Sequence, residues 1–119
     1  LTIMSNFTIY HNPRCSKSRQ TLEILNKQNA QVEIVLYLEK PPSAREMQSL
    51  LDKLGLCSRD IIRKGEDEYK HLNLKDNNLT ENELINFMSE NPRLIERPIV
   101  VKGDKAVIGR PPENVLSLF

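Results

Sequence analysis

The sequence lacks the features of membrane-spanning, secreted and metal-binding proteins. No run approaches the roughly 18 apolar residues that a spanning helix needs, and the opening stretch LTIMSNFTIY has neither the basic leader nor the apolar core of a signal peptide. Its two cysteines, Cys15 and Cys57, are too few for a disulfide framework and lack metal-ligand spacing. We therefore expect a soluble cytoplasmic protein with reduced thiols and no metal site.

An excess of either charge is also missing. The 17 Lys and Arg residues nearly cancel the 16 Asp and Glu residues, so no global field favours a nucleic acid or an anionic membrane, and we expect neither as a partner. Any anion specificity must therefore come from a local site. The 119 residues suit one domain, which we expect to span residues 1–119 as a monomer.

The beginning of the chain has the pattern of a β-α-β unit. Residues 7–10 (FTIY) and 32–38 (VEIVLYL) have the composition of strands. Between them, a helical spacing starts at Ser16 and links Ser18, Thr21 or Leu22, Leu25 and Gln28. A helical crossover of this kind normally makes the two strands parallel neighbours.

The middle of the chain predicts a helical insertion over about residues 43–91. Two capping boxes begin helices there, SARE at 43–46 and TENE at 80–83. The apolar residues that follow share a helix face: Met47, Leu50, Leu51 and Leu54 in one helix, and Leu84, Ile85 and Met88 in the other. Gly55 and the pair Asn91-Pro92 end these helices, and short helices and turns are expected over 56–79.

The end of the chain predicts a hairpin and a helix. PIVV at 98–101 and AVI at 106–108 flank the turn KGDK. The closing RPPENVLSLF predicts a helix with Val115, Leu116 and Phe119 facing inward. The complete order, βαβ, insertion, ββα, predicts an α/β sandwich.

Cys15 lies at the start of the first predicted helix, within YHNPRCSKSRQTL. A lone cysteine is more often a small buried apolar residue than a nucleophile. A helix N-terminus, however, favours thiolate over thiol and offers N–H donors to an oxyanion. Four side chains within four residues could add positive charge: His11, Arg14, Lys17 and Arg19. This position favours a reactive thiolate beside an anion site.

Other thiol chemistries fit the stretch less well. CSKS supplies only one thiol of a Cys-x-x-Cys redox pair. Arg19 comes four residues after Cys15, a shorter spacing than that of the cysteine phosphatases. Cys57 has no basic cluster closer than Arg59, and we expect it to be structural.

Five motifs together point to a family. YHNPRCSKSRQTL, LYLEKPP, IIRK, ERPIVV and IGRPPE occur in this order, and the chain closely resembles the ArsC-type arsenate reductases that use glutathione and glutaredoxin, within the ArsC/Spx group and near its small YfgD-like members. The resemblance implies a thioredoxin- or glutaredoxin-like fold with a central mixed sheet and a helical insertion. It also implies one nucleophilic cysteine and arginines that surround the oxyanion.

The resemblance assigns roles to individual residues. Cys15 matches the nucleophile. Neighbouring positions that orient the thiolate or lower its pKa are matched by His11, Asn12, Ser18 and Arg19, of which Asn12 is also expected to contact the substrate. The anion-binding arginines are matched by Arg63, Arg97 and Arg110, and the cis-proline beside the site by Pro98. The pair Ser16-Lys17 departs from the glycine and small residue of plasmid-borne members.

The chemistry of arsenate requires such an arrangement. Arsenate is a dianion near neutral pH, so a thiolate can approach it only where cations offset the repulsion, and arginine offers paired donors that suit oxyanions. The first hypothesis is therefore an arsenate reductase with glutathione as co-substrate, glutaredoxin as partner and no bound cofactor. Two alternatives remain: a redox-sensitive interaction protein like the Spx regulators, and a single-cysteine oxidoreductase acting on glutathione mixed disulfides.

Overall fold

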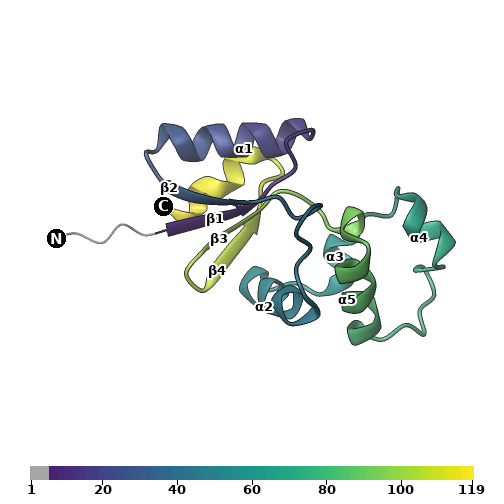
Figure 1. The fold of residues 1–119 in the computed structure, drawn as a ribbon. Coiled ribbons are helices and arrows are strands. Elements are labelled where there is room, and N and C mark those ends of the chain that lie inside the picture. The colour runs from purple at the N-terminus through teal and green to yellow at the C-terminus, as the bar shows by residue number, and fades with distance from the viewer. Residues whose placement is uncertain (1–5) are drawn as a thin grey trace. The chain divides into compact units, whose positions relative to one another are not determined.

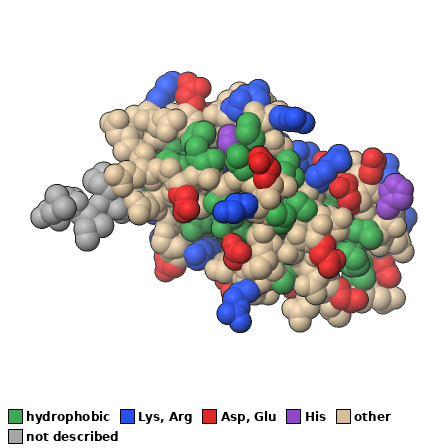
Figure 2. Space-filling view, viewed as in Figure 1, with side chains coloured by type: hydrophobic (Ala, Val, Ile, Leu, Met, Phe, Trp, Pro, Cys, Tyr) green, Lys and Arg blue, Asp and Glu red, His purple; other side chains and the backbone are tan. Residues whose placement is uncertain are grey.

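A computed structural model describes residues 6–119, which form two compact units. One unit runs up to Tyr37 and resumes at Arg97–Phe119, and the other is Leu38–Glu96. The expectation of a single domain stays a prediction. Basic and acidic side chains are interspersed on the face drawn in Figure 2, in keeping with the balanced charge. Within the described range no helix is long and apolar enough to cross a membrane.

The first unit is built on a mixed four-stranded sheet (Figure 1). Its strands are β1 (Asn6–Tyr10), β2 (Gln31–Val35), β3 (Ile99–Lys102) and β4 (Lys105–Ile108), in the order β2-β1-β3-β4. β1 pairs parallel with β2 and antiparallel with β3, and β3 pairs antiparallel with β4. The predicted β-α-β unit and the hairpin are both confirmed.

One α-helix and one 3₁₀ helix lie side by side in this unit: α1 (Ser16–Lys27) and η2 (Pro112–Leu118) (Figure 1). The buried core they share with the sheet consists of Phe7, Ile9, Leu25, Val100, Val115 and Leu118. Ser18, Thr21 and Leu25 are the buried residues of α1, as their spacing predicts. Gln28 was expected on the same face but is exposed, because the helix ends there and Gln28 is its C-cap.

The second strand is shorter than predicted. β2 ends at Val35, and Leu38 lies in a turn and is exposed. β2 is an edge strand that pairs with β1, and this ladder ends where Tyr10 pairs with Val35. β1 ends at that pair and the chain turns at residues 37–39, so the apolar run 36–38 leaves the sheet.

The closing helix has a different register from the predicted one. Pro112–Leu118 is a 3₁₀ helix, in which residues three apart eclipse one another. The buried residues are therefore Pro112, Val115 and Leu118. The prediction for Val115 is confirmed, whereas that for Leu116 is wrong, because Leu116 is 44% exposed. The prediction for Phe119 is confirmed only in part: the residue is 50% exposed, but its ring stacks on the buried ring of Phe7 with the centroids 4.8 Å apart.

The second unit is helical and matches the predicted insertion. It contains α2 (Ala44–Leu54), α3 (Ser58–Ile61), α4 (Asp67–His71), α5 (Glu81–Glu90) and the 3₁₀ helix η1 (Pro92–Leu94). Both capping boxes are present, at Ser43 with Glu46 and at Thr80 with Glu83. Of the residues expected to face the core, Met47, Leu50, Leu51, Leu84, Ile85 and Met88 are buried.

The 3₁₀ register of η2 predicts that alanine substitutions at Leu118 and Leu116 lower the free energy of unfolding by different amounts. Leu118→Ala should lower the free energy of unfolding by about 2 kcal/mol or more, because it leaves a cavity in the core. Leu116→Ala should change it by less than about 0.5 kcal/mol, because the side chain is largely solvated. Urea denaturation followed by circular dichroism measures both. Equal effects of the two substitutions would contradict the 3₁₀ register.

Candidate functional site

The sheet topology brings three separate stretches of the first unit to one edge. β1 ends at Tyr10, which pairs with Ile99 at the start of β3, and Ile99 pairs in turn with Ile108 at the end of β4. The loop after β1, the residues before β3 and the residues after β4 therefore leave the sheet together. These stretches contain Cys15, Arg97 and Arg110, respectively.

Cys15 is the N-cap of α1, where the sequence placed it. Its backbone is extended, with φ −94° and ψ 122°, and its N–H donates to the carbonyl of Asn12 at 3.0 Å. The carbonyl of Cys15 accepts the N–H of Arg19 at 3.0 Å, the first bond of the helix. The thiol is free and half-buried. The sulfur is thus held at the positive end of the helix dipole.

The surroundings of Cys15 lower the pKa of its thiol. Burial is the largest single influence and acts in the opposite direction, because it disfavours the anion. It is outweighed by the backbone N–H groups of Ser18 and Lys17, by the charge of Arg110, and by a hydrogen bond from the Arg97 side chain. Helix donors and two arginines distant in sequence therefore stabilise the thiolate.

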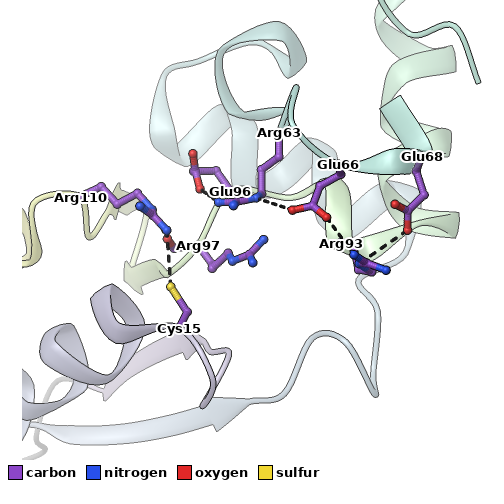
Figure 3. A network of polar contacts seen from close by, with 8 residues as sticks. All are labelled: Cys15, Arg63, Glu66, Glu68, Arg93, Glu96, Arg97 and Arg110. Atoms are coloured by element: carbon purple, nitrogen blue, oxygen red, sulfur yellow. Dashed lines mark hydrogen bonds and ion pairs between the residues drawn. The ribbon is translucent and has the colours of Figure 1, made fainter. Parts of the chain in front are cut away.

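Arg110 reaches the sulfur directly (Figure 3). Its Nη2 donates to Cys15 Sγ at 3.4 Å, and its Nε donates to the carbonyl of Arg97 at 2.8 Å. The Arg97–Pro98 peptide bond is cis, as the resemblance implied, and so is the Arg110–Pro111 bond. Two of the three predicted anion-binding arginines and the predicted nucleophile therefore share one unit.

The loop before Cys15 is held by a buried hydrogen-bond network. His11 Nδ1 lies 2.6 Å from Ser18 Oγ, and the same oxygen accepts the backbone N–H of Asn12 at 3.1 Å. Asn12 Oδ1 accepts the N–H of Arg14 at 3.0 Å. All three of His11, Asn12 and Ser18 are buried. These side chains fix the loop conformation that presents Cys15.

His11 and Arg19 support the loop in different ways. Burial, and secondarily the charge of Arg19, lower the pKa of His11, so its imidazole is neutral at pH 7 and adds no positive charge near the sulfur. Arg19 Nη1 donates to the carbonyl of Pro13 at 2.8 Å and so ties the first turn of α1 to the loop. Both residues thus hold the loop that precedes Cys15, and their part in catalysis stays a prediction.

Arg63 belongs to the second unit and has two carboxylate partners there (Figure 3). Its Nε is 3.1 Å from Glu66 Oε2, and its Nη1 is 2.6 Å from Glu96 Oε1. Burial would lower the pKa of Arg63, but its hydrogen bonds to Glu66 and Glu96 and the charges of these carboxylates raise it. Its part in anion binding stays a prediction.

The sequence analysis did not identify the carboxylates around Arg63. Glu66 also accepts from Arg93 Nη2 at 3.1 Å, so it joins two arginines. An isolated antiparallel bridge between Ile62 and Ile95 brings the stretches that carry Arg63 and Glu96 together. The motif ERPIVV contained Glu96, but sequence alone offered no sign that its partner was Arg63, because the bridge forms between distant stretches.

Cys57 has different surroundings from Cys15. It is exposed at the N-cap of α3, and its Sγ donates to Asp60 Oδ2 at 3.2 Å. The Cys57 sulfur thus lies beside a carboxylate, whereas the Cys15 sulfur lies beside guanidinium groups. Among residues 6–119, no group of three or more His, Cys, Asp or Glu side chains is placed to hold a metal ion.

The lowered pKa of Cys15 predicts selective alkylation at mildly acidic pH. Iodoacetamide should modify Cys15 well below the usual thiol pKa of about 8.5, because the thiolate is the reacting form. Mass spectrometry of peptides after timed exposure across pH 5–9, about the range in which thiols titrate, gives a rate profile for each cysteine. Cys57 is the internal control. An apparent pKa for Cys15 at or above that of a free thiol would contradict the electrostatic argument.

Comparison with known proteins finds relatives over most of the chain. The ArsC family profile matches residues 10–118. The chain is 55% identical to a protein of Escherichia coli K12 named "Uncharacterized protein YfgD", over 92% of this chain and 93% of that one. It is 51% identical to "Arsenate reductase" of Haemophilus influenzae, over 93% of this chain and 97% of that one.

A solved structure shows the same fold. "Arsenate reductase from Vibrio cholerae" superposes with a TM-score of 0.95 at 46% identity, covering 98% of this chain and 100% of that one. The thioredoxin-like α/β class with a mixed sheet, implied by the resemblance, is thereby confirmed. On the family match and on these identities over most of its length, the chain belongs to the ArsC family.

Proposed function

We propose that the protein is an arsenate reductase that uses glutathione as co-substrate and glutaredoxin as partner. The observation that supports this most directly is the Cys15 sulfur, which lies at the N-terminus of α1 with Arg110 Nη2 at 3.4 Å. The relatives named arsenate reductase support the choice of oxyanion. Glutathione and glutaredoxin are proposed from the resemblance of the motifs.

The proposed reaction begins with covalent catalysis by Cys15. Its thiolate attacks As(V), so that a sulfur–arsenic bond forms and an arsenic–oxygen bond breaks, with the oxygen leaving as hydroxide or, after protonation, as water. Arsenic keeps its oxidation state in this step. Glutathione then attacks the thio-adduct, and glutaredoxin completes the reduction. In this attack a second arsenic–oxygen bond breaks and a glutathione–arsenic bond forms, with arsenic still As(V). The glutaredoxin thiolate then attacks the glutathione sulfur, so that a glutathione–glutaredoxin disulfide forms and the electron pair of the broken sulfur–arsenic bond stays on arsenic, which becomes As(III). Water finally displaces Cys15 from arsenic and releases arsenite and the thiolate.

The protein's part is to lower the cost of bringing two anions together. The N–H groups of Ser18 and Lys17 and the side chains of Arg97 and Arg110 already favour the thiolate. Guanidinium groups also suit a tetrahedral oxyanion, because their donors lie in a planar fork. The same groups can therefore stabilise the nucleophile before attack and the substrate's charge during it.

The first test is turnover with the complete set of reductants. Purified protein with arsenate, glutathione, glutaredoxin and an NADPH-linked regenerating system should oxidise NADPH in an arsenate-dependent way. Cys15→Ser should abolish this rate, because a hydroxyl is a far weaker nucleophile at neutral pH. Cys57→Ser is the matched control and should retain it. A wild-type rate no greater than background would reject the proposal, and greater activity on a glutathionylated thiol would favour the oxidoreductase alternative.

The second test removes the arginines. Arg97→Ala or Arg110→Ala should lower arsenate turnover by about 10²-fold or more, the scale for one preorganised electrostatic donor. We expect the same of Arg63→Ala from the resemblance alone. Lysine at these positions should restore only part of the rate, because it returns the charge without the planar fork.

An exposed arginine on α2 provides the control for these variants. Arg45→Ala should leave turnover unchanged, since its side chain lies on the surface. Thermal unfolding of each variant separates lost catalysis from lost structure. Near-normal turnover in all three arginine variants would show that Cys15 reacts with arsenate without help from these arginines.

A further inference from the structure

The backbone that carries Arg110 is packed tightly on both sides. The N–H of Gly109 donates to the carbonyl of Pro98 at 2.9 Å. A Cβ added to Gly109 would lie 2.4 Å from Thr21 Oγ1 and 2.8 Å from Pro98 Cγ. The segment thus lies directly against α1 and against the residues that precede β3, with no room for a side chain at position 109.

A second contact fixes the same segment from η2. The side-chain amide of Asn114 donates to the carbonyl of Ile108 at 3.2 Å and to the carbonyl of Arg110 at 3.0 Å. An asparagine amide has two donors, and here they hold the carbonyls on either side of Gly109. Asn114 itself is exposed, so core packing does not explain its position.

Small movements of this segment matter for Arg110. Its Nη2 lies 3.4 Å from Cys15 Sγ, and its Nε is bound to the Arg97 carbonyl at 2.8 Å. Hydrogen bonds weaken steeply with loss of alignment, and the attraction between unlike charges falls with distance. Holding the carbonyls of residues 108 and 110 therefore holds the guanidinium against the sulfur.

We propose that Asn114 is a positioning residue for the Cys15 site, which acts by bracing Ile108–Arg110 against Thr21 and Pro98 so that Arg110 stays in contact with the sulfur. The proposal rests on the proposed function only in taking the Cys15 thiolate as the reacting group. None of the motif assignments includes Asn114, and its amide binds the backbone carbonyls of Ile108 and Arg110, not the sulfur or the guanidinium.

The decisive readout is the pH profile of Cys15 alkylation, which a purely structural role would not move. In Asn114→Ala, loss of the two hydrogen bonds should raise the apparent pKa of Cys15 by up to about one unit. The alkylation rate of Cys15 at pH 6 should then fall by about two- to tenfold. Asn114→Ser keeps one hydroxyl donor, so the apparent pKa of Cys15 in this variant should lie between the values of wild type and Asn114→Ala. Arg110→Ala sets the upper limit of the effect.

Ser117→Ala is the matched control. Ser117 lies in the same 3₁₀ helix and its Oγ donates to the carbonyl of Asn114 at 2.9 Å, so the variant loses a hydrogen bond of η2 without touching the 108–110 carbonyls. Its pH profile should equal that of wild type. Thermal unfolding should show small and similar shifts for Asn114→Ala and Ser117→Ala, because both residues are exposed.

A double substitution tests whether Asn114 acts through Arg110. In an Arg110→Ala background, Asn114→Ala should cause no further change in the pH profile, since residues that act through one contact are not additive. An unchanged profile in Asn114→Ala, or an equal further shift in the double variant, would overturn the proposal. Wild-type protein with a low Cys15 pKa and no arsenate turnover would reject the proposed function and leave this inference standing.

Discussion

The arrangement of this site depends on keeping a sulfur anion stable in a half-buried position. Burial by itself favours the neutral thiol, so the protein must supply donors that outweigh it. The N–H groups at the start of α1 are available as soon as the helix forms, because no residue within the helix can accept them. Arg110 and Arg97 supply the rest, and they require the complete sheet of the first unit.

The mixed topology of the sheet explains why these groups meet. A parallel β1–β2 pair needs a crossover helix, and this helix places its N-terminus just beyond the end of β1. The antiparallel pairing of β1 with β3 and of β3 with β4 then directs the residues before β3 and after β4 to that same edge. Cys15, Arg97 and Arg110 are thus neighbours because the strands that carry their segments run in these directions.

The second unit organises its charges differently. Arg63 is bound by Glu66 and Glu96, and Glu66 also binds Arg93, so these arginines are paired with carboxylates of their own unit. Glu66 is the most enclosed of these charges, with its side chain 14% exposed. Removing one member of such a partly buried network leaves its partners' charges less well compensated, which makes the network sensitive to single substitutions. Arg97 and Arg110, by contrast, contribute to stabilising the sulfur of Cys15.

The sequence by itself determined the local elements and the reactive position. Capping boxes at Ser43 and Thr80 marked two helices correctly, because cap chemistry is decided within four residues. The helical spacing that starts at Ser16 is also a local signal, and it correctly predicted that Cys15 lies at the N-terminus of α1. Tertiary structure decided what depends on distant partners: the end of β2 at Val35, the 3₁₀ register that buries Leu118 instead of Leu116, and the contact of Arg110 with the Cys15 sulfur. These features were not predictable from spacing, because each is fixed by a contact between stretches that only the folded sheet and its covering helices bring together.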